Sequence, residues 1–228
     1  MSQVTNRTIA CPNCGHEQNF IIWDSLNGIL DPEAKDSLIN GTLFRFKCDE
    51  CGYETEVVYD ILYHDMEHHT MVYRVQPESV EQAGQYMLIA SEKTKSLDAN
   101  LPKTRNRIVT DNNRLREKAI IFGAGLDDRI VEIVKLICWM EAVKTITDAK
   151  EEDMYFNITN DSNWIVEIVG KDVSCNVPKE MYDQISSQFS PIFDQIGDDE
   201  LIVDHNFAGT VCLAFNDAHK NNKKPWQN

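Results

Sequence analysis

The sequence predicts an α+β protein with an N-terminal zinc ribbon containing β strands, a helical middle, and a small C-terminal antiparallel sheet with helices. Cys-x-x-Cys-Gly motifs stand at 11–15 and 48–52, residues 127–140 follow a helical period, and residues 154–177 follow a period of two. We expect four parts: a zinc-ribbon β domain at 1–77, a helical segment at 78–150 packed on the ribbon or on the C-terminal part, an α+β domain at 151–220, and a disordered tail at 221–228.

Aromatic and β-branched residues predict the strands of the ribbon. These strands are expected at 20–23, 42–46, 53–59 and 71–75. Between the first two, Asp31 and Pro32 are typical of a helix start, so a short helix is predicted before Asn40-Gly41. The 33 residues that separate Cys14 from Cys48 exceed the usual spacing of a ribbon, and the inserted helix accounts for most of the excess.

Helical periodicity predicts three helices in the middle of the chain. They are expected from residue 78 until the helix frays at 93–100, from Thr110 or Asp111 to about 122, and from 127 to 143. Gly123-Ala124-Gly125 is interpreted as a helix break and not as a phosphate cradle, because no Lys-Ser/Thr pair follows it. Asp127-Asp128 is interpreted as a helix cap, and the apolar face of the helix that follows fits either a core or a dimer seam.

A change of period marks the C-terminal part. Strands are predicted at 154–159, 164–169 and 173–177, and a helix begins at Pro178. A short strand near 201–203 and a last helix over 207–219 complete the expected fold.

Cysteine usage indicates a reducing compartment. Of the seven cysteines, four form the two pairs, and Cys138, Cys175 and Cys212 stand singly in apolar surroundings. This pattern argues against a disulfide framework. The polar start of the chain does not have the pattern of a signal peptide, and no apolar run approaches the roughly 18–20 residues of a membrane span. We therefore expect a cytoplasmic protein with no membrane association.

The charge of the chain bears on its partners. The formal net charge is −15, and residues 1–77 alone carry five Lys/Arg against twelve Asp/Glu. Nucleic-acid binders present basic surfaces that displace the counterions of phosphates, and an electronegative surface repels those phosphates. A nucleic-acid partner is therefore disfavoured, and we expect a protein partner or self-association.

The two cysteine pairs supply four thiolates, which are enough to close a tetrahedral site around one Zn²⁺ ion. A rubredoxin-like iron site and a redox-active Cys-x-x-Cys pair are the alternatives. His16 is a further candidate ligand, but four cysteines leave no position for it. The predicted metal ligands are Cys11, Cys14, Cys48 and Cys51.

The glycines after each pair suit such a site. Gly15 and Gly52 allow a left-handed backbone that turns nearby N–H groups toward sulfur, and these hydrogen bonds stabilise thiolates. A shell of four protein ligands leaves no open position for water, so the predicted zinc is structural and not catalytic.

The segment His64-Asp65-Met66-Glu67-His68-His69 is the second cluster of candidate site residues. It can form a second metal site or an acid–base pair, while the simpler interpretation is a polar turn with surface histidines.

The main hypothesis is a non-catalytic zinc protein that acts as an interaction or assembly module. An enzyme, hydrolase-like, that uses His64 with Asp65 or Glu67 is the first alternative, and side chains that point apart would contradict it. A nucleic-acid-binding zinc ribbon is the second.

Several of these motifs resemble the bacterial CpXC domain proteins. The resemblance rests on the segments 11–15, 43–53 and 62–67 and extends to 107–109, 115–118 and 124–129. It covers roughly the first 140 residues and, more weakly, the remainder. The family has no known function. The resemblance implies metal binding at the four paired cysteines, and it places His64-Asp65 in the family pattern while His68-His69 is particular to this chain.

Overall fold

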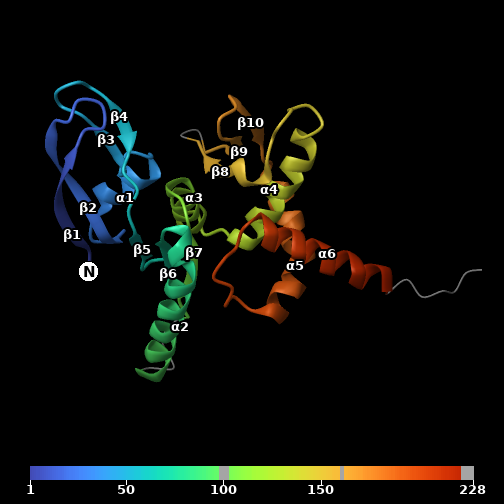
Figure 1. The fold of residues 1–228 in the computed structure, drawn as a ribbon. Coiled ribbons are helices and arrows are strands. Elements are labelled where there is room, and N and C mark those ends of the chain that lie inside the picture. Colours follow the sequence, from blue (N-terminus) through green and yellow to red (C-terminus); the bar gives the residue numbers. More distant parts are fainter. Residues whose placement is uncertain (98–102, 160–161, 222–228) are drawn as a thin grey trace, which may run out of the picture. The chain divides into compact units, whose positions relative to one another are not determined.

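A computed structural model describes residues 1–97, 103–159 and 162–221 and divides the chain into two compact units, 1–124 and 125–228. Both units combine helices with antiparallel strand pairs (Figure 1). The two cysteine pairs lie in turns between strands of the N-terminal unit. The predicted α+β class is therefore confirmed. The finer division into domains at 77, 150 and 220 stays a prediction, and most of the expected disordered tail lies outside the described residues.

The first unit is built on a five-stranded sheet, which consists in spatial order of β1 (Gln3–Ala10), β2 (Glu17–Asn27), β5 (Ile61–Asp65), β6 (Thr70–Arg74) and β7 (Arg105–Val109). The pairs β1–β2 and β5–β6 are antiparallel, whereas β2–β5 and β6–β7 are parallel. Parallel neighbours require long connections. The connection from β2 to β5 contains α1 (Pro32–Ile39) and the second cysteine pair, and the connection from β6 to β7 contains α2 (Val80–Leu97).

A separate two-stranded ribbon carries the second cysteine pair. It consists of β3 (Arg45–Lys47) and β4 (Glu54–Glu56), which pair antiparallel. The first cysteine pair likewise joins two antiparallel strands, β1 and β2. The predicted strands at 42–46 and 53–59 are thus present but shorter, because only three residues on each side pair.

Helices cover one face of the five-stranded sheet. The helix α3 (Asn112–Gly123) contacts β5, β6 and α1, and α1 also contacts β2 (Figure 1). Its N-terminus is where the sequence predicts it, since the Asp111 carboxylate accepts a hydrogen bond from the Arg114 amide at 2.8 Å. Asp31 precedes α1 as predicted, but its side chain makes no capping hydrogen bond.

The structure of segment 61–65 differs from the turn that the sequence predicts. The sequence favours a turn at the histidine-rich segment, whereas the structure forms the strand β5 there and confines the turn to 66–69. Ile61, Tyr63 and Asp65 alternate with half-buried neighbours, so the strand has a buried face although one of its buried residues is a carboxylate. The strands β1 and β7 were not predicted either, because their sequences are dominated by polar side chains.

The second unit packs a helix, a small sheet and two further helices together. Its described elements are α4 (Asp128–Ala142), a 3-10 turn (Glu151–Asp153), β8 (Met154–Ile158), β9 (Trp164–Ile168), β10 (Val173–Asn176), α5 (Lys179–Ile196) and α6 (His205–Asn221). The strands form an antiparallel sheet in the order β10-β9-β8, as predicted. The segment 201–203, which was predicted as a strand, has no strand partner in the described part of the chain.

The apolar face of α4 belongs to the core of this unit. α4 contacts α5, α6 and β8, and Ile130, Ile133, Val134 and Cys138 are buried. The rings of Phe189 on α5 and Phe215 on α6 pack together with centroids 4.6 Å apart and an interplanar angle of 30°. The question whether this helical face forms core or a dimer seam is thus answered in favour of core within one chain.

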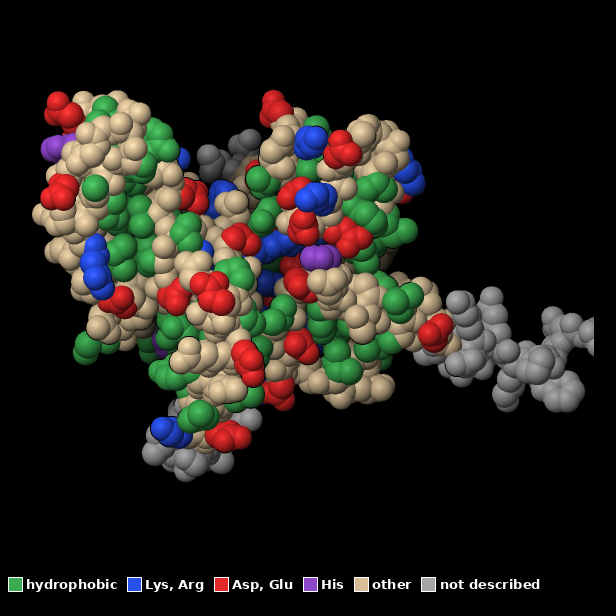
Figure 2. All heavy atoms as spheres, in the orientation of Figure 1, with side chains coloured by type: hydrophobic (Ala, Val, Ile, Leu, Met, Phe, Trp, Pro, Cys, Tyr) green, Lys and Arg blue, Asp and Glu red, His purple; other side chains and the backbone are tan. Residues whose placement is uncertain are grey.

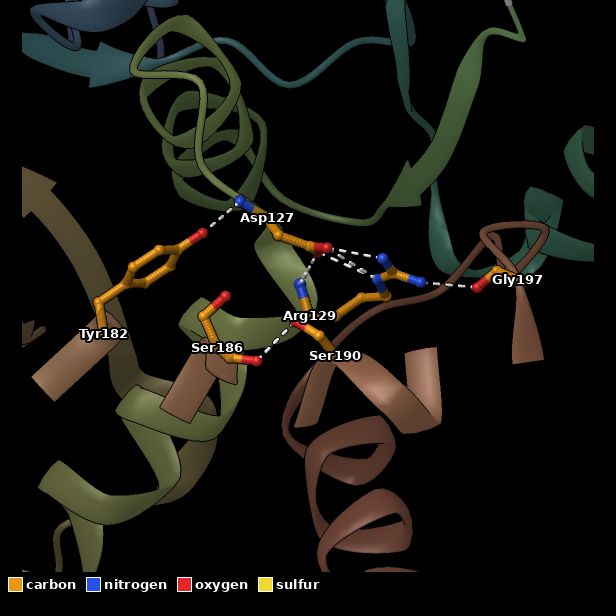
Figure 3. Close-up of polar contacts among 6 residues, drawn as sticks. All are labelled: Asp127, Arg129, Tyr182, Ser186, Ser190 and Gly197. Atoms are coloured by element: carbon orange, nitrogen blue, oxygen red, sulfur yellow. Dashed lines mark hydrogen bonds and ion pairs between the residues drawn. The ribbon is translucent and has the colours of Figure 1, made fainter. Parts of the chain in front are cut away.

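A network of hydrogen bonds fixes the start of α4 (Figure 3). The Asp127 carboxylate accepts from the Arg129 amide at 3.0 Å and from the Arg129 guanidinium at 2.6 Å, so the predicted capping role of Asp127 is confirmed. The guanidinium also donates to the carbonyl of Gly197 at 2.6 Å and lies over the Phe193 ring. The Asp127 amide donates to the Tyr182 hydroxyl at 2.8 Å. These contacts show that Asp127 has a structural role at the start of α4.

Acidic side chains are spread over the visible surface and do not gather in one patch (Figure 2). Among the residues that the structure describes, no helix combines the length and the apolar character needed to cross a bilayer.

A close approach between Gly28 and Tyr63 generates a first prediction. A Cβ atom at Gly28 would lie 3.0 Å from the Tyr63 hydroxyl oxygen and 3.0 Å from Cδ of Lys35. We expect Gly28→Ala to lower the free energy of unfolding by about 1–3 kcal/mol through overpacking. In a Tyr63→Phe background, the loss of unfolding free energy caused by Gly28→Ala should fall to less than half. Urea denaturation of the wild type, the two single variants and the double variant measures this difference. An equal loss in both backgrounds would contradict the steric explanation.

Candidate metal centre

The first cysteine pair lies in a tight turn between β1 and β2. The Cys11 amide donates to the carbonyl of His16 at 2.8 Å, and the Gly15 amide donates back to the carbonyl of Cys11 at 2.9 Å. Gly15 has a φ of 74°, which lies in the left-handed region as predicted. The turn therefore closes on itself and directs both cysteine side chains to one side.

The second pair repeats this geometry. The Cys48 amide donates to the carbonyl of Tyr53 at 2.9 Å, and the Gly52 amide donates to the carbonyl of Cys48 at 2.9 Å. Gly52 has a φ of 70°. Two segments that are distant in sequence thus adopt the same hydrogen-bonded turn, which we call knuckle 1 (11–16) and knuckle 2 (48–53).

The two knuckles bring all four predicted sulfur ligands together. Their Sγ atoms all lie within 4.8 Å of one another, and the distances between knuckles are 3.7 Å from Cys11 to Cys51 and 3.6 Å from Cys14 to Cys48. A tetrahedron with metal–sulfur bonds of about 2.3 Å has edges of about 3.8 Å. The thiols therefore fit the donor set of a tetrahedral metal ion and can hold one.

The cluster is buried on one side only. Cys11 and Cys48 are buried with Phe46, and Ile9, Phe20 and Val57 pack around them as partly buried neighbours. Cys14 and Cys51 are exposed. The apolar cluster beneath the sulfur atoms is small, so side-chain burial contributes little to holding the two knuckles together.

Electrostatics within the cluster favour a bound cation. The Asn13 amide group donates to Cys51 Sγ at 3.5 Å, and this bond, with one from the Tyr53 backbone, lowers the pKa of Cys51 to about 6. A hydrogen bond from the His16 backbone acts in the same direction on Cys14, but burial and the other three thiols outweigh it and raise the pKa of Cys14 to about 12. Four thiols this close cannot all ionise unless a cation neutralises them.

The donors to sulfur are partly as predicted. The residues that follow Gly15 and Gly52 supply the backbone hydrogen bonds, as the sequence suggests. The contribution of Asn13 was not predicted; the polar residue inside the first Cys-x-x-Cys motif is the signal that could have indicated it. His16 is exposed and is not among the four residues of the cluster.

The structure separates His64 from Asp65. The two residues are neighbours on β5, and successive side chains of a strand point to opposite faces. Asp65 is buried on the helix-covered face, whereas His64 is half-buried, and burial lowers the pKa of His64 below its usual range. The geometry gives no support to an acid–base pair of His64 with Asp65.

Asp65 instead pairs with His68. The Asp65 carboxylate lies 3.0 Å from His68 Nδ1, accepts from the amides of Glu67 and His68, and lies 3.6 Å from Lys35 Nζ. Burial alone would raise the pKa of this carboxyl, but these partners outweigh burial and lower it. The sequence contains a signal for this turn, since Asp frequently accepts from amides two and three residues further on.

The same cluster is a poor metal site. Ligand atoms of Asp65, Glu67 and His68 lie within 4.8 Å of one another. However, one oxygen of Asp65 already accepts two amides, and the other faces His68 and the ammonium group of Lys35. These hydrogen bonds satisfy the carboxylate and hold the β5–β6 turn, which matches the interpretation as a polar turn.

Two antiparallel strand pairs, each with a Cys-x-x-Cys turn, define an α+β protein with a cluster of four cysteines that can hold a metal ion. The chain belongs to the CpXC family: the model of that family, described as CpXC protein, matches residues 9–135 and so includes both knuckles. The resemblance to the CpXC family that the sequence motifs indicate is therefore confirmed. A search of curated proteins and a search of solved structures find no match to this chain.

The knuckle glycines generate a second prediction. A Cβ atom at either position would meet no atom within 4 Å, so the cost of substitution comes only from the left-handed backbone. We expect Gly15→Ala and Gly52→Ala each to lower the free energy of unfolding by about 1–2 kcal/mol. Gly123→Ala is the matched control, because this glycine is equally uncrowded but has no positive φ. Thermal and urea denaturation measure the effect, and unchanged stability of both knuckle variants would refute the explanation.

The Asp65 contacts generate a third prediction. Because the pKa of Asp65 is lowered from 3.8 in the folded state, its contribution to stability is complete above that value and is lost as the pH falls further. We expect Asp65→Asn to cost about 1–3 kcal/mol at pH 7, with a difference from the wild type that shrinks toward pH 3. Urea denaturation at several pH values measures this difference, and any metal lost in acid affects both proteins alike.

Glu67→Gln is the control for that series, since Glu67 is exposed in the same turn and should show little effect at any pH. A difference between Asp65→Asn and the wild type that stays constant down to pH 3 would show that the charge of Asp65 does not stabilise the turn.

Proposed function

We propose that the chain is a non-catalytic CpXC protein in which one Zn²⁺ ion, bound by Cys11, Cys14, Cys48 and Cys51, holds the fold of an interaction or assembly module. The observation that carries this proposal is the meeting of four sulfur atoms from two matching knuckles. Zinc has no directional preference of its own, and four thiolates complete its usual structural coordination.

A complete shell of protein ligands supports a structural role. Catalytic zinc sites keep a position for water or substrate, and four cysteines leave none. The ion would instead link β1–β2 with β3–β4, and the three-residue strands β3 and β4 are too short to be stable alone. Structural zinc can contribute on the order of 10–16 kcal/mol of binding free energy to folding.

The surface charge argues against nucleic-acid and membrane partners, which leaves a protein partner or self-association as the proposed mode of action. A net charge of −15 repels phosphate backbones and anionic membranes. The enzyme alternative has little support, because Asp65 is engaged with His68 and Lys35 and not with His64. A reducing, cytoplasmic location remains part of the proposal, since it would keep the thiols available for metal.

Metal analysis tests the proposal directly. We expect the purified protein to carry one zinc per chain, and we expect Cys14→Ser and Cys51→Ser to lose most of it. Chelation should lower the unfolding midpoint strongly, because the metal supplies folding free energy. Cys212→Ser is the matched control, since this cysteine lies outside the cluster and should leave the zinc content unchanged.

Three results would overturn the proposal. The first is a protein without zinc, and the second is a fold that chelation leaves untouched. The third is salt-sensitive binding to DNA or RNA in a mobility-shift assay, which would favour a nucleic-acid-binding ribbon. Iron in place of zinc would preserve the coordination but point to the rubredoxin-like alternative.

A further inference from the structure

A hollow of about 460 Å³ opens in the first unit between β2, the turn that precedes α1, and α1 itself. This volume lies within the range of about 300–1,000 Å³ that is typical of ligand pockets. Its lining includes Trp23, Leu30, Asp31, Glu33, Ser37 and Leu43. The hollow thus combines an indole ring and aliphatic side chains with two carboxylates.

The charge of the lining selects the chemistry of an occupant. No lysine or arginine is among the residues that line the hollow. The N-terminus of α1 contributes about half a positive charge, which two carboxylates outweigh. The site is therefore electronegative, and it disfavours phosphate or carboxylate ligands while favouring a cation.

The hydrogen bonds of Asp31 are compatible with this assignment. Although it precedes the helix, its carboxylate does not cap α1. It accepts instead a hydrogen bond from the Ser2 hydroxyl, and the backbone N–H of Asn27 donates to the oxygen of that hydroxyl at 2.9 Å. The carboxylate is thus anchored by the first residues of the chain and keeps further lone pairs for a second donor.

We propose that this hollow binds an arginine side chain of a protein partner. A guanidinium group can stack on the half-buried Trp23 ring while its N–H groups donate to the carboxylates of Asp31 and Glu33. Leu30 and Leu43 offer apolar contacts to the methylene stem. The inference rests on the proposed function as an interaction module and names the chemistry of its partner.

The charge of the chain favours the same occupant. With a net charge of −15, the protein attracts basic segments over longer distances and repels a second acidic copy of itself. A free amine would share the charge of arginine but not the planar face that stacks on an indole. The occupant to which the observations point is therefore an arginine-bearing segment.

A peptide titration of the zinc-loaded full-length protein tests the proposal. The probe is an acetylated and amidated pentapeptide with arginine at its centre and alanine elsewhere, and the matched peptides carry citrulline or lysine at that centre. Two-dimensional ¹H–¹⁵N NMR follows the Trp23 indole and the backbone of α1. We expect a Kd on the order of 1 mM for the arginine peptide, and at least tenfold weaker binding of the neutral citrulline peptide.

Variants locate the binding. Asp31→Asn, Glu33→Gln and Trp23→Leu should each weaken binding of the arginine peptide by about threefold or more, consistent with roughly 0.7 kcal/mol or more per contact. Asp36→Asn is the matched control, because it removes the same charge from the same helix without lining the hollow. Glu33 is exposed, so its variant is expected to fold normally even if substitution at Asp31 disturbs the turn.

The outcomes separate clearly. Equal binding of the arginine and citrulline peptides, equal weakening by Asp36→Asn, or shifts confined to other parts of the chain would overturn the proposal. A lysine peptide that binds as tightly as the arginine peptide would also overturn it, because stacking on Trp23 would then contribute nothing. Since zinc content is measured first, failure of peptide binding in a zinc-loaded protein leaves the proposed metal function intact.

Discussion

The convergence of four thiols is the constraint on which the first unit depends. Each knuckle is a self-closed turn, but β3 and β4 pair over only three residues each. The apolar cluster below the sulfur atoms contains a single buried aromatic ring, Phe46. Four thiolates at these distances would repel one another, so all four thiols can ionise only when a cation balances their charge.

Much of this centre could be predicted because its signals are local. Two Cys-x-x-Cys-Gly motifs contain both the ligands and the glycines that the turns require, so spacing alone indicated the four cysteines. The helix starts at Pro32 and after Asp111 were equally visible, since capping residues and apolar periodicity act over a few residues. In the C-terminal unit, the alternation of β8 to β10 indicated the sheet for the same reason.

The errors arise where long-range packing overrides local pattern. β5 carries Asp65 on its buried face, which a period-two pattern of apolar residues cannot indicate. Its burial is tolerated only because Lys35, from an element 30 residues earlier, and His68, from the following turn, both lie beside the carboxylate. Likewise, β1 is largely polar and becomes a strand through pairing with β2, and β7 is placed by its parallel pairing with β6.

The long insertion between the knuckles lies in the loop that a metal ion at the four cysteines would close. A plain ribbon needs few residues between its cysteine pairs, whereas here the connection contains β2, α1 and the hollow beside them. A metal that joins Cys14 to Cys48 closes this loop and so lowers the entropy that its ordering costs. Bound metal would in this way also restrict the segment that carries Trp23 and Asp31, because both residues lie between Cys14 and Cys48. In the proposed function the cysteines would support a recognition surface, and that surface would lie in the residues inserted between the two knuckles.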